Sequence, residues 1–598
     1  MKALRPIERM HTPPIAHDGF ALHPVSYLLP YLRAHALRIL AGLVAIAAGT
    51  GFAVAQPYIL RLAVDSLRGH GNVATLEKYV LLYLAAAFGQ ALFAFVQRST
   101  VNRVSRYVEY GLRNDAFRHL QSLDQAYLHT MHTGDLMARL TNDLNAVRQF
   151  VGMGMVSILS TGFMLSVTAV LMFAIDAKLA FVSFAVLPFV SITMVIVGRA
   201  VQHRFRSVQD QFGALSTSAQ ENLTGIRVVK AFGQEQHEVL AFARANENYV
   251  QLNLGYARLS GIMWPLMFFV MGIALALVLF VGGSDVATRR ISLGEFVQFN
   301  AYLAMLTWPM ISLGWVINLY QQGMASMKRV MEVLEREPNI RDDFAEAVET
   351  IRGKIEFRDV GVAYDDRWVF RNVSFTIPAG STTAVVGLTG AGKSTLLSLV
   401  PRILEADEGQ VLIDGVDIRR LPLDMLRRHV GYVPQDTFLF SATLRDNTLF
   451  GVDADDEDQV QHAIRVSRLE GDIPQLTLGL DTIVGERGVS LSGGQKQRTA
   501  LARAILRDPT ILLLDDALSS VDTQTQAEIL RELHEVMRTR TTLITSMRLS
   551  TVKDADQIIM LDSGSVAERG NHQQLLNSDG LYARLYRREL LRQELEVE

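Results

Sequence analysis

The sequence predicts two fused parts, a membrane domain built only of helices and a soluble α/β domain with a mainly parallel sheet. Three observations lead to this fold class: six long apolar segments before residue 325, alternating β-rich and amphipathic runs after Lys354, and a glycine-rich turn between a strand-like run and a helical run. The mean hydropathy of +0.18 and the charged fraction of 20% agree with a chain that lies partly in a bilayer.

Length and composition exclude several classes of protein. A chain of 598 residues is too long for a single hydrophobic core. The 58 basic and 61 acidic residues leave a formal net charge of -3, so we expect no nucleic-acid partner. Because the chain has no cysteine, disulfides, cysteine-ligated metal sites and a cysteine nucleophile are excluded.

The N-terminal part is expected to lead into the membrane. Residues 1–21 lack periodicity and a secretory signal, which indicates a cytosolic tail. Residues 22–36 mix apolar and aromatic side chains with Arg33, a pattern typical of a short helix at the membrane surface. The membrane domain is expected over 37–325, with six spans near or above the ~20 residues that cross a bilayer. These spans are 39–60, 79–97, 151–175, 179–198, 261–283 and 293–319.

The gaps between the spans predict the orientation in the membrane. The two long gaps, 98–150 and 199–260, keep helical periodicity, so we expect the helices to continue beyond the bilayer. They also carry more Arg and Lys than the short gaps do. The positive-inside bias therefore predicts that the long gaps and both termini lie in the cytosol.

The composition changes after the last span. Residues 326–350 are charged and are expected to form a linker, 351–590 a soluble domain, and 591–598 a tail. Within the soluble domain, strand-like runs such as TTAVVG, ILLLDD and QIIMLD alternate with amphipathic helical runs. This alternation predicts an α/β domain with a mainly parallel sheet.

A phosphate-binding motif stands near the start of this domain. Residues 387–394 fit GxxxxGK[ST], follow a strand-like run and open a helical run, which is the context that this motif requires. Backbone NH groups of the glycines can approach phosphate oxygens, Lys393 can reach the outer phosphates, and the Ser394 hydroxyl can bind Mg²⁺. The predicted nucleotide contacts here are Gly387, Leu388, Thr389, Gly390, Ala391, Gly392, Lys393, Ser394 and Thr395.

Two further features agree with a nucleotide site. The apolar run from Ile511 ends in Asp515, a carboxylate placed to hold Mg²⁺ directly or through water. A second turn that enters a helix, Ser492-Gly493-Gly494-Gln495, is another candidate anion site.

These motifs occur in the order and spacing of an ABC transporter ATPase domain, and the chain resembles a half-transporter of the multidrug and lipid exporter type (type IV fold) over residues 22–590. The resemblance implies ATP and Mg²⁺ as cofactors. It implies that Tyr364 stacks on adenine. It also implies that Gln435 is a catalytic Q-loop residue, which binds Mg²⁺ together with Ser394 and Asp515. The X-loop and D-loop would be formed by Thr482 to Gly488 and by Ser519 to Asp522, respectively.

In that family two ATPase domains close head to tail, so each ATP lies between the phosphate loop of one chain and the LSGGQ of the other. Ser492, Gly493, Gly494 and Gln495 would therefore contact the ATP bound by a partner chain. The segments Gln121 to Asp135 and Ser216 to Gly225 resemble coupling helices, although ordinary amphipathic helix remains the alternative.

The chain departs from the family at two catalytic positions. The family places Glu after the Walker B aspartate, and here Asp516 stands there. The carboxylate is drawn back by about 1.5 Å, and a 1 Å misplacement can cost about 100-fold in rate. Met547 stands at the position of the switch histidine that contacts the γ-phosphate, and a thioether cannot donate a hydrogen bond.

These departures favour a heterodimer. This chain's own site is expected to be slow, while its LSGGQ completes a competent site on a second half-transporter that carries the Glu and the His. The expected substrates are hydrophobic or amphipathic drugs, lipids or peptides, exported across a bacterial cytoplasmic membrane with the ATPase domain in the cytosol. The alternatives are a homodimeric lipid flippase, a siderophore importer with the exporter-type fold, and an ATP-gated channel. The methionine-rich spans fit either a soft ligand surface or simple helix packing, and packing is favoured.

Overall fold

The computed structural model describes residues 23–68, 73–342, 348, 350–364, 367–452, 456–485 and 491–597. The chain divides into two compact units, of which the first comprises Met1–Gln121 with His132–Arg336, and the second comprises Ser122–Met131 with Glu337–Glu598. The predicted tail at 1–21 lies outside the described residues, as do residues 486–490, which include part of the predicted X-loop.

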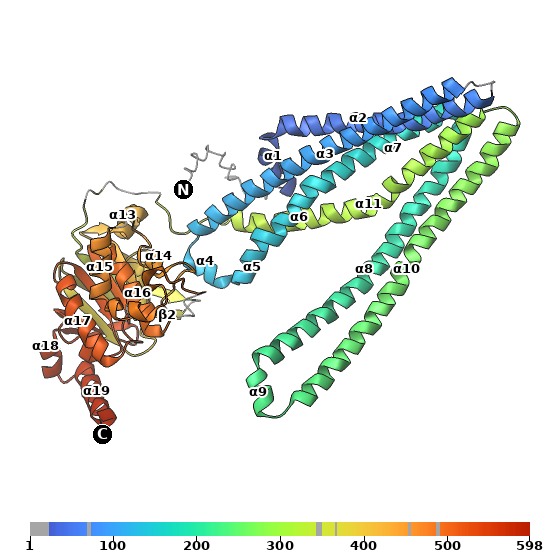
Figure 1. The fold of residues 1–598 in the computed structure, drawn as a ribbon. Coiled ribbons are helices and arrows are strands. Elements are labelled where there is room, and N and C mark those ends of the chain that lie inside the picture. The colour runs from blue at the N-terminus through green and yellow to red at the C-terminus, as the bar shows by residue number, and fades with distance from the viewer. Residues whose placement is uncertain are drawn as a thin grey trace. The chain divides into compact units, whose positions relative to one another are not determined.

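The first unit is helical, as the sequence predicts (Figure 1). Two of its segments, η1 and η2, are π-helical and interrupt the run from α5 to α7. The elements are α1 (Pro24–Arg33), α2 (Ala36–Arg68), α3 (Val73–Ser122), α5 (Thr133–Ala138), η1 (Arg139–Asp143), α6 (Leu144–Gln149), η2 (Phe150–Gly154), α7 (Met155–Ile175), α8 (Ala177–Thr224), α9 (Ile226–Ala231), α10 (Glu235–Ala287) and α11 (Leu293–Leu334).

Five helical stretches among the described residues are long and apolar enough to cross a membrane: Ala36–Leu67, Val73–Ser122, Thr133–Ile175, Glu235–Ala287 and Leu293–Leu334. They contain five of the six predicted spans. The remaining span, 179–198, lies within α8, whose apolar part among the described residues is Ala177–Val186.

The longest helices continue well past a bilayer. The 53 residues of α10 correspond to about 80 Å of helix, against about 30 Å for the hydrocarbon core. In Figure 1, α8 and α10 run side by side and are joined through α9 at one end. The sequence signal for this length was the helical periodicity of the charged long gaps.

Several methionines in the spans pack between helices. Met172, Met267 and Met310 are buried with Phe299 and Tyr302 in one hydrophobic cluster. The Tyr302 hydroxyl donates to the main-chain oxygen of Val54 at 3.0 Å, which fixes α11 against α2. These contacts agree with the packing interpretation of the methionine-rich spans.

The second unit contains two sheets. The six-stranded sheet has the order β10-β9-β3-β8-β7-β6 and is parallel from β9 to β6, as predicted. A four-stranded sheet, β2-β1-β4-β5, is antiparallel and was not predicted. The strands are β1 (Ile355–Tyr364), β2 (Arg367–Ile377), β3 (Thr382–Gly387), β4 (Glu408–Ile413), β5 (Val416–Asp417), β6 (Val430–Val433), β7 (Ile511–Asp515), β8 (Thr541–Thr545), β9 (Gln557–Asp562) and β10 (Ser565–Gly570).

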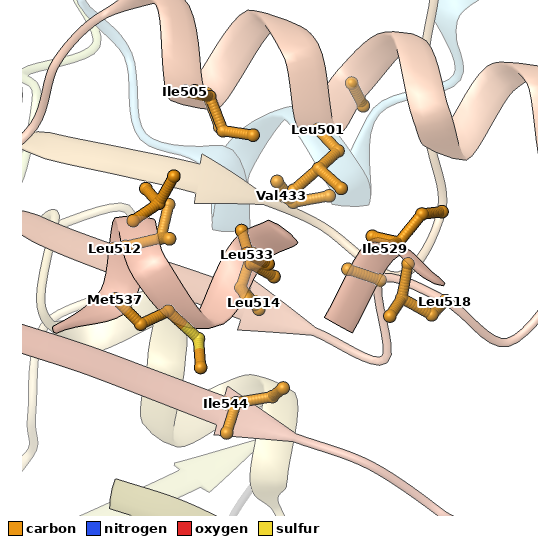
Figure 2. Close-up of a cluster of buried hydrophobic side chains, with 14 of the residues drawn as sticks. Val433, Leu501, Ile505, Leu512, Leu514, Leu518, Ile529, Leu533, Met537 and Ile544 are labelled. Atoms are coloured by element: carbon orange, nitrogen blue, oxygen red, sulfur yellow. The ribbon is translucent and has the colours of Figure 1, made fainter. Parts of the chain in front are cut away.

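Helices cover the six-stranded sheet and bury its apolar side chains. Figure 2 shows Leu512 and Leu514 of β7 among side chains of the two helices that contain Leu501 and Leu533. Both helices begin at side-chain caps, Ser492 and Asp522. The helices of this unit are α4 (Gln125–Thr130), α12 (Lys393–Leu399), α13 (Leu423–Arg428), α14 (Leu444–Thr448), α15 (Glu457–Val466), α16 (Gly493–Leu506), α17 (Thr523–Met537), α18 (His572–Asn577) and α19 (Leu581–Val597).

The two segments that resemble coupling helices, 121–135 and 216–225, lie in different parts of the fold. The first contains α4, within the stretch Ser122–Met131 that groups with the second unit although its flanking helices belong to the first. The second, 216–225, is the last part of α8 and ends at Gly225, where the chain turns into α9.

Candidate functional site

The phosphate loop joins β3 to α12, where the sequence places it. Two of its positions need glycine, one because a Cβ would clash with a neighbour and one also because its φ angle is positive. A Cβ on Gly387 would lie 2.5 Å from the main-chain oxygen of Leu561. Gly392 has a φ of +88°, and a Cβ there would lie 2.7 Å from Phe370. The loop backbone is therefore held in a shape that leaves its NH groups available for an anion.

Lys393 lies at the centre of this loop. Its Nζ donates to the main-chain oxygens of Gly387 at 2.9 Å and Leu388 at 3.0 Å. Burial lowers the pKa of the Lys393 ammonium, while the carboxylates of Asp516 and Asp515 oppose that shift. The ammonium is thus held inside the loop, where it can reach a bound phosphate.

Replacing Lys393 with Ala is expected to weaken ATP binding by about tenfold or more, because a charge-assisted contact to phosphate is lost. Titration of the full chain in nanodiscs with a fluorescent ATP analogue measures the affinity. Lys553→Ala removes an exposed lysine of the same unit and is the matched control. Equal affinity in wild type and Lys393→Ala would contradict this assignment.

Two carboxylates stand at the end of β7. Asp515 is 2% exposed, and Oδ1 accepts a hydrogen bond from the Thr545 hydroxyl at 2.7 Å. Asp516 has a φ of +46°, and its main-chain NH bonds to Thr545 O at 3.1 Å and Oγ1 at 3.0 Å. Thr545 therefore fixes both residues, a role that no short sequence motif indicates.

The side-chain carboxyl of Asp516 has a raised pKa. Burial is the largest cause that raises the pKa of its carboxyl, and the neighbouring Asp515 raises it further. A hydrogen bond from the main-chain NH of Met547, together with Lys393 and Arg548, lowers it. The net result is a pKa above the ordinary value of an aspartate side chain.

Met547 faces the phosphate loop. Its sulfur lies 3.7 Å from the Lys393 ammonium and 4.0 Å from the Thr389 hydroxyl, and the residue is 52% exposed. The thioether is a weak acceptor and has no proton to donate to a phosphate oxygen. Lys393, Thr389, Asp516 and Met547 are thus brought together, and Met547 supplies no hydrogen-bond donor from its side chain.

The LSGGQ turn forms the N-terminus of α16. Ser492 and Gln495 cap each other reciprocally, with Gln495 N donating to Ser492 Oγ at 3.2 Å and Ser492 N donating to Gln495 Oε1 at 3.0 Å. A Cβ on Gly493 or Gly494 would meet Ser520 at 3.2 Å or 3.1 Å. The turn is therefore pre-shaped against the D-loop.

A buried ion pair supports this turn and was not found from the sequence. Arg498 binds both carboxylate oxygens of Asp472, and both side chains are 11% exposed. Gln495 also donates to Asp472 at 3.3 Å, and Gln497 donates to Ser519 at 3.0 Å. No short motif contains Asp472, so only the contact with α16 reveals its role.

The other predicted site residues lie on loops or element ends. Tyr364 ends β1, is 49% exposed and pairs across the hairpin with Arg367. Gln435 is exposed and follows β6 by two residues. Ser394 and Thr395 lie in the first turn of α12. Ser394, Gln435 and Asp515 offer the hard oxygen donors that Mg²⁺ prefers.

The fold and the site together define a class of protein, a P-loop ATPase fused to a helical membrane domain. Residues 39–310 match the family model for the ABC transporter transmembrane region, and residues 370–519 match the ABC transporter family model. The chain belongs to the ABC transporter family and is a half-transporter of the exporter type. It is a multi-pass protein of the bacterial cytoplasmic membrane with its ATPase domain in the cytosol.

Relatives and a solved structure share nearly the whole architecture. A probable multidrug resistance ABC transporter of Bacillus subtilis is 35% identical and covers 94% of this chain and 97% of the relative. An ATP-dependent lipid A-core flippase of Syntrophus aciditrophicus is 34% identical, and the match covers 94% of this chain and 93% of the flippase. The structure of a bacterial Atm1-family ABC exporter with ATP bound has a TM-score of 0.78 at 29% identity and covers 92% of this chain and 98% of that chain.

Proposed function

We propose that this chain is the slow-site subunit of a heterodimeric ABC exporter. The observation that carries the proposal is the position of Met547, whose sulfur lies 3.7 Å from the Lys393 ammonium. A residue at that place contacts the outer phosphates, and a thioether cannot donate the hydrogen bond that would stabilise charge in the transition state. Asp516 in place of Glu adds a second deficit to the same site.

We expect ATP to bind this chain although Asp516 and Met547 replace the family's glutamate and histidine. The phosphate loop and Lys393 hold the phosphates, Ser394, Asp515 and Gln435 hold Mg²⁺, and Tyr364 stacks on the adenine. When bound, Mg²⁺ neutralises phosphate charge. Slow turnover at an intact binding site favours long occupancy by ATP.

The LSGGQ turn of this chain serves the opposite site. Its reciprocal caps, its contact with Ser520 and the Asp472–Arg498 pair all support an intact anion-binding turn. We expect the partner half-transporter to carry the Walker B Glu and the switch His, so that one composite site is competent. A homodimer would contain two impaired sites.

The transported substrate is a hydrophobic or amphipathic drug, lipid or peptide. Similarity to a probable multidrug resistance transporter and to a lipid A-core flippase supports this class. The second candidate is a homodimeric lipid flippase, which the 34% identity with the flippase of Syntrophus aciditrophicus favours.

The test compares Mg²⁺-dependent ATPase rates in lipid for this chain alone and for the chain co-expressed with a candidate half-transporter encoded nearby. The heterodimer is supported when activity needs the partner and disappears when the partner's Walker B Glu becomes Gln. The slow-site proposal is overturned, and the homodimer favoured, if the chain alone hydrolyses ATP as fast as the complex and loses this activity in Asp516→Asn.

A further inference from the structure

The C-terminal helix α19 contacts the loop that carries Met547. The Glu589 carboxylate accepts from the main-chain NH of Leu549 at 2.6 Å and from the NH and hydroxyl of Ser550 at 3.3 Å and 2.7 Å. Leu549 and Ser550 follow Met547 by two and three residues. One side chain, about 40 residues away along the sequence, thus holds three donors of this loop.

The loop needs an external acceptor at this point. Leu549–Thr551 form a single 3₁₀ turn, η8, whose N-cap residue Arg548 makes no side-chain capping hydrogen bond. The first NH groups of a helical turn have no partner within the turn, so they require an acceptor from elsewhere. Glu589 supplies a charged one, which binds more strongly than a neutral acceptor.

Packing alone does not hold the loop. A cavity of about 190 Å³ lies beside it, lined by Met547, Arg548 and Thr551 of the loop and by Asp516 and Gln526, among others. On that side a polar chain supports the loop, in which Arg548 donates to Gln526 at 2.7 Å and Gln526 donates to Thr551 at 2.9 Å. Leu549 and Val552 pack in the core, but the cavity leaves room beside Met547, so hydrogen bonds add to this packing in positioning the loop.

Helix α19 is a firm support for Glu589. The Glu568 carboxylate of β10 accepts from the main-chain NH groups of Leu581 and Tyr582 at the start of α19. Tyr582 is fully buried, and its hydroxyl lies 2.7 Å from Nδ1 of His572. Tyr582 and Glu589 are seven residues apart and therefore share one face of the helix.

We infer that Glu589 is a positioning residue that holds the Met547 loop at the phosphate end of the ATP site. Displacement of the loop would move the Met547 sulfur away from Lys393 and the Met547 NH away from the Asp516 carboxylate. The C-terminal helix therefore sets ATP affinity at a site that it does not touch. The inference rests on ATP binding at this chain's own site and is independent of the heterodimer.

The experiment uses the full chain in lipid nanodiscs and two readouts, ATP affinity and amide exchange of a peptide covering 546–552. Glu589→Ala is expected to weaken ATP binding by about tenfold and to speed exchange in this peptide, because three hydrogen bonds are lost. Glu589→Gln keeps one acceptor oxygen and should fall between Glu589→Ala and wild type. Arg588→Ala changes the exposed neighbour on α19 and should match wild type.

The outcomes separate this inference from the function proposed above. Faster exchange with unchanged ATP affinity makes Glu589 a structural contact only and overturns the inference, and so does unchanged exchange. If Glu589→Ala does not fold, the same criteria apply to Glu589→Gln. Wild-type protein that binds ATP no better than Lys393→Ala would refute the ATP site itself rather than the role of Glu589.

Discussion

The double variant Asp516→Glu with Met547→His is expected to raise the ATPase rate of the chain purified alone by about 100-fold or more. Glutamate extends the carboxylate by one methylene toward the attacking water, and histidine brings a hydrogen-bond donor to the place where the Met547 sulfur now faces Lys393. A homodimer of this variant contains two restored sites, each completed by an intact LSGGQ turn. Steady-state phosphate release in nanodiscs measures the change.

The single variants and a blocked variant serve as controls. Each single change should give less than the pair, because both residues act on the same transferring phosphate and their effects are coupled. Adding Lys393→Ala to the double variant should return the rate to background. A double variant no faster than wild type, with ATP binding retained, would show that Asp516 and Met547 do not limit turnover.

In a complex with a competent partner, Gly494→Asp in this chain is expected to lower ATP turnover by about 100-fold or more, whereas Lys393→Ala lowers it by less than tenfold. A Cβ at Gly494 would lie 3.1 Å from the main-chain oxygen of Ser520, and the added carboxylate would repel the phosphates of the partner's ATP. Under the proposed division of the two sites, Lys393 serves only the slow site. ATPase rates of the purified complexes at equal concentration test this asymmetry.

The control for this prediction introduces the same charge at a distance from the turn. His462 is exposed on α15, so His462→Asp should leave turnover close to that of the wild-type complex. If Lys393→Ala abolished turnover as completely as Gly494→Asp, both sites would be needed for hydrolysis. The division into one slow and one competent site would then be wrong.

Much of the fold could be predicted from the sequence because its signals are local. Span length follows from runs of apolar residues, and the phosphate loop follows from glycines and Lys393 at fixed spacing between a strand and a helix. The antiparallel sheet was missed although β1 and β2 form a local hairpin, because β1 also pairs with the distant β4, for example Phe357 with Val411, without a distinctive sequence pattern.

In the candidate site, too, the residues in short motifs could be predicted, whereas the residues that act through distant contacts could not. Asp515, Asp516 and the LSGGQ turn were found because each is a short contiguous motif. Thr545, which fixes both aspartates, and Asp472, which supports the LSGGQ turn, act across separations of about 20 to 30 residues. Single-sequence patterns carry no information about such contacts.

By itself, the sequence determined that this protein has a helical membrane domain and a phosphate-binding ATPase domain. It also places Asp516 and Met547 at two positions where the resemblance implies glutamate and histidine. Those facts depend on residue identity and local spacing. Only the tertiary structure decided that the Met547 sulfur faces Lys393, and that Glu589 of α19 holds the same loop. The reason is physical, since these contacts form only when strands β3 and β8 pair and α19 packs beside them, which brings distant residues into hydrogen-bonding range.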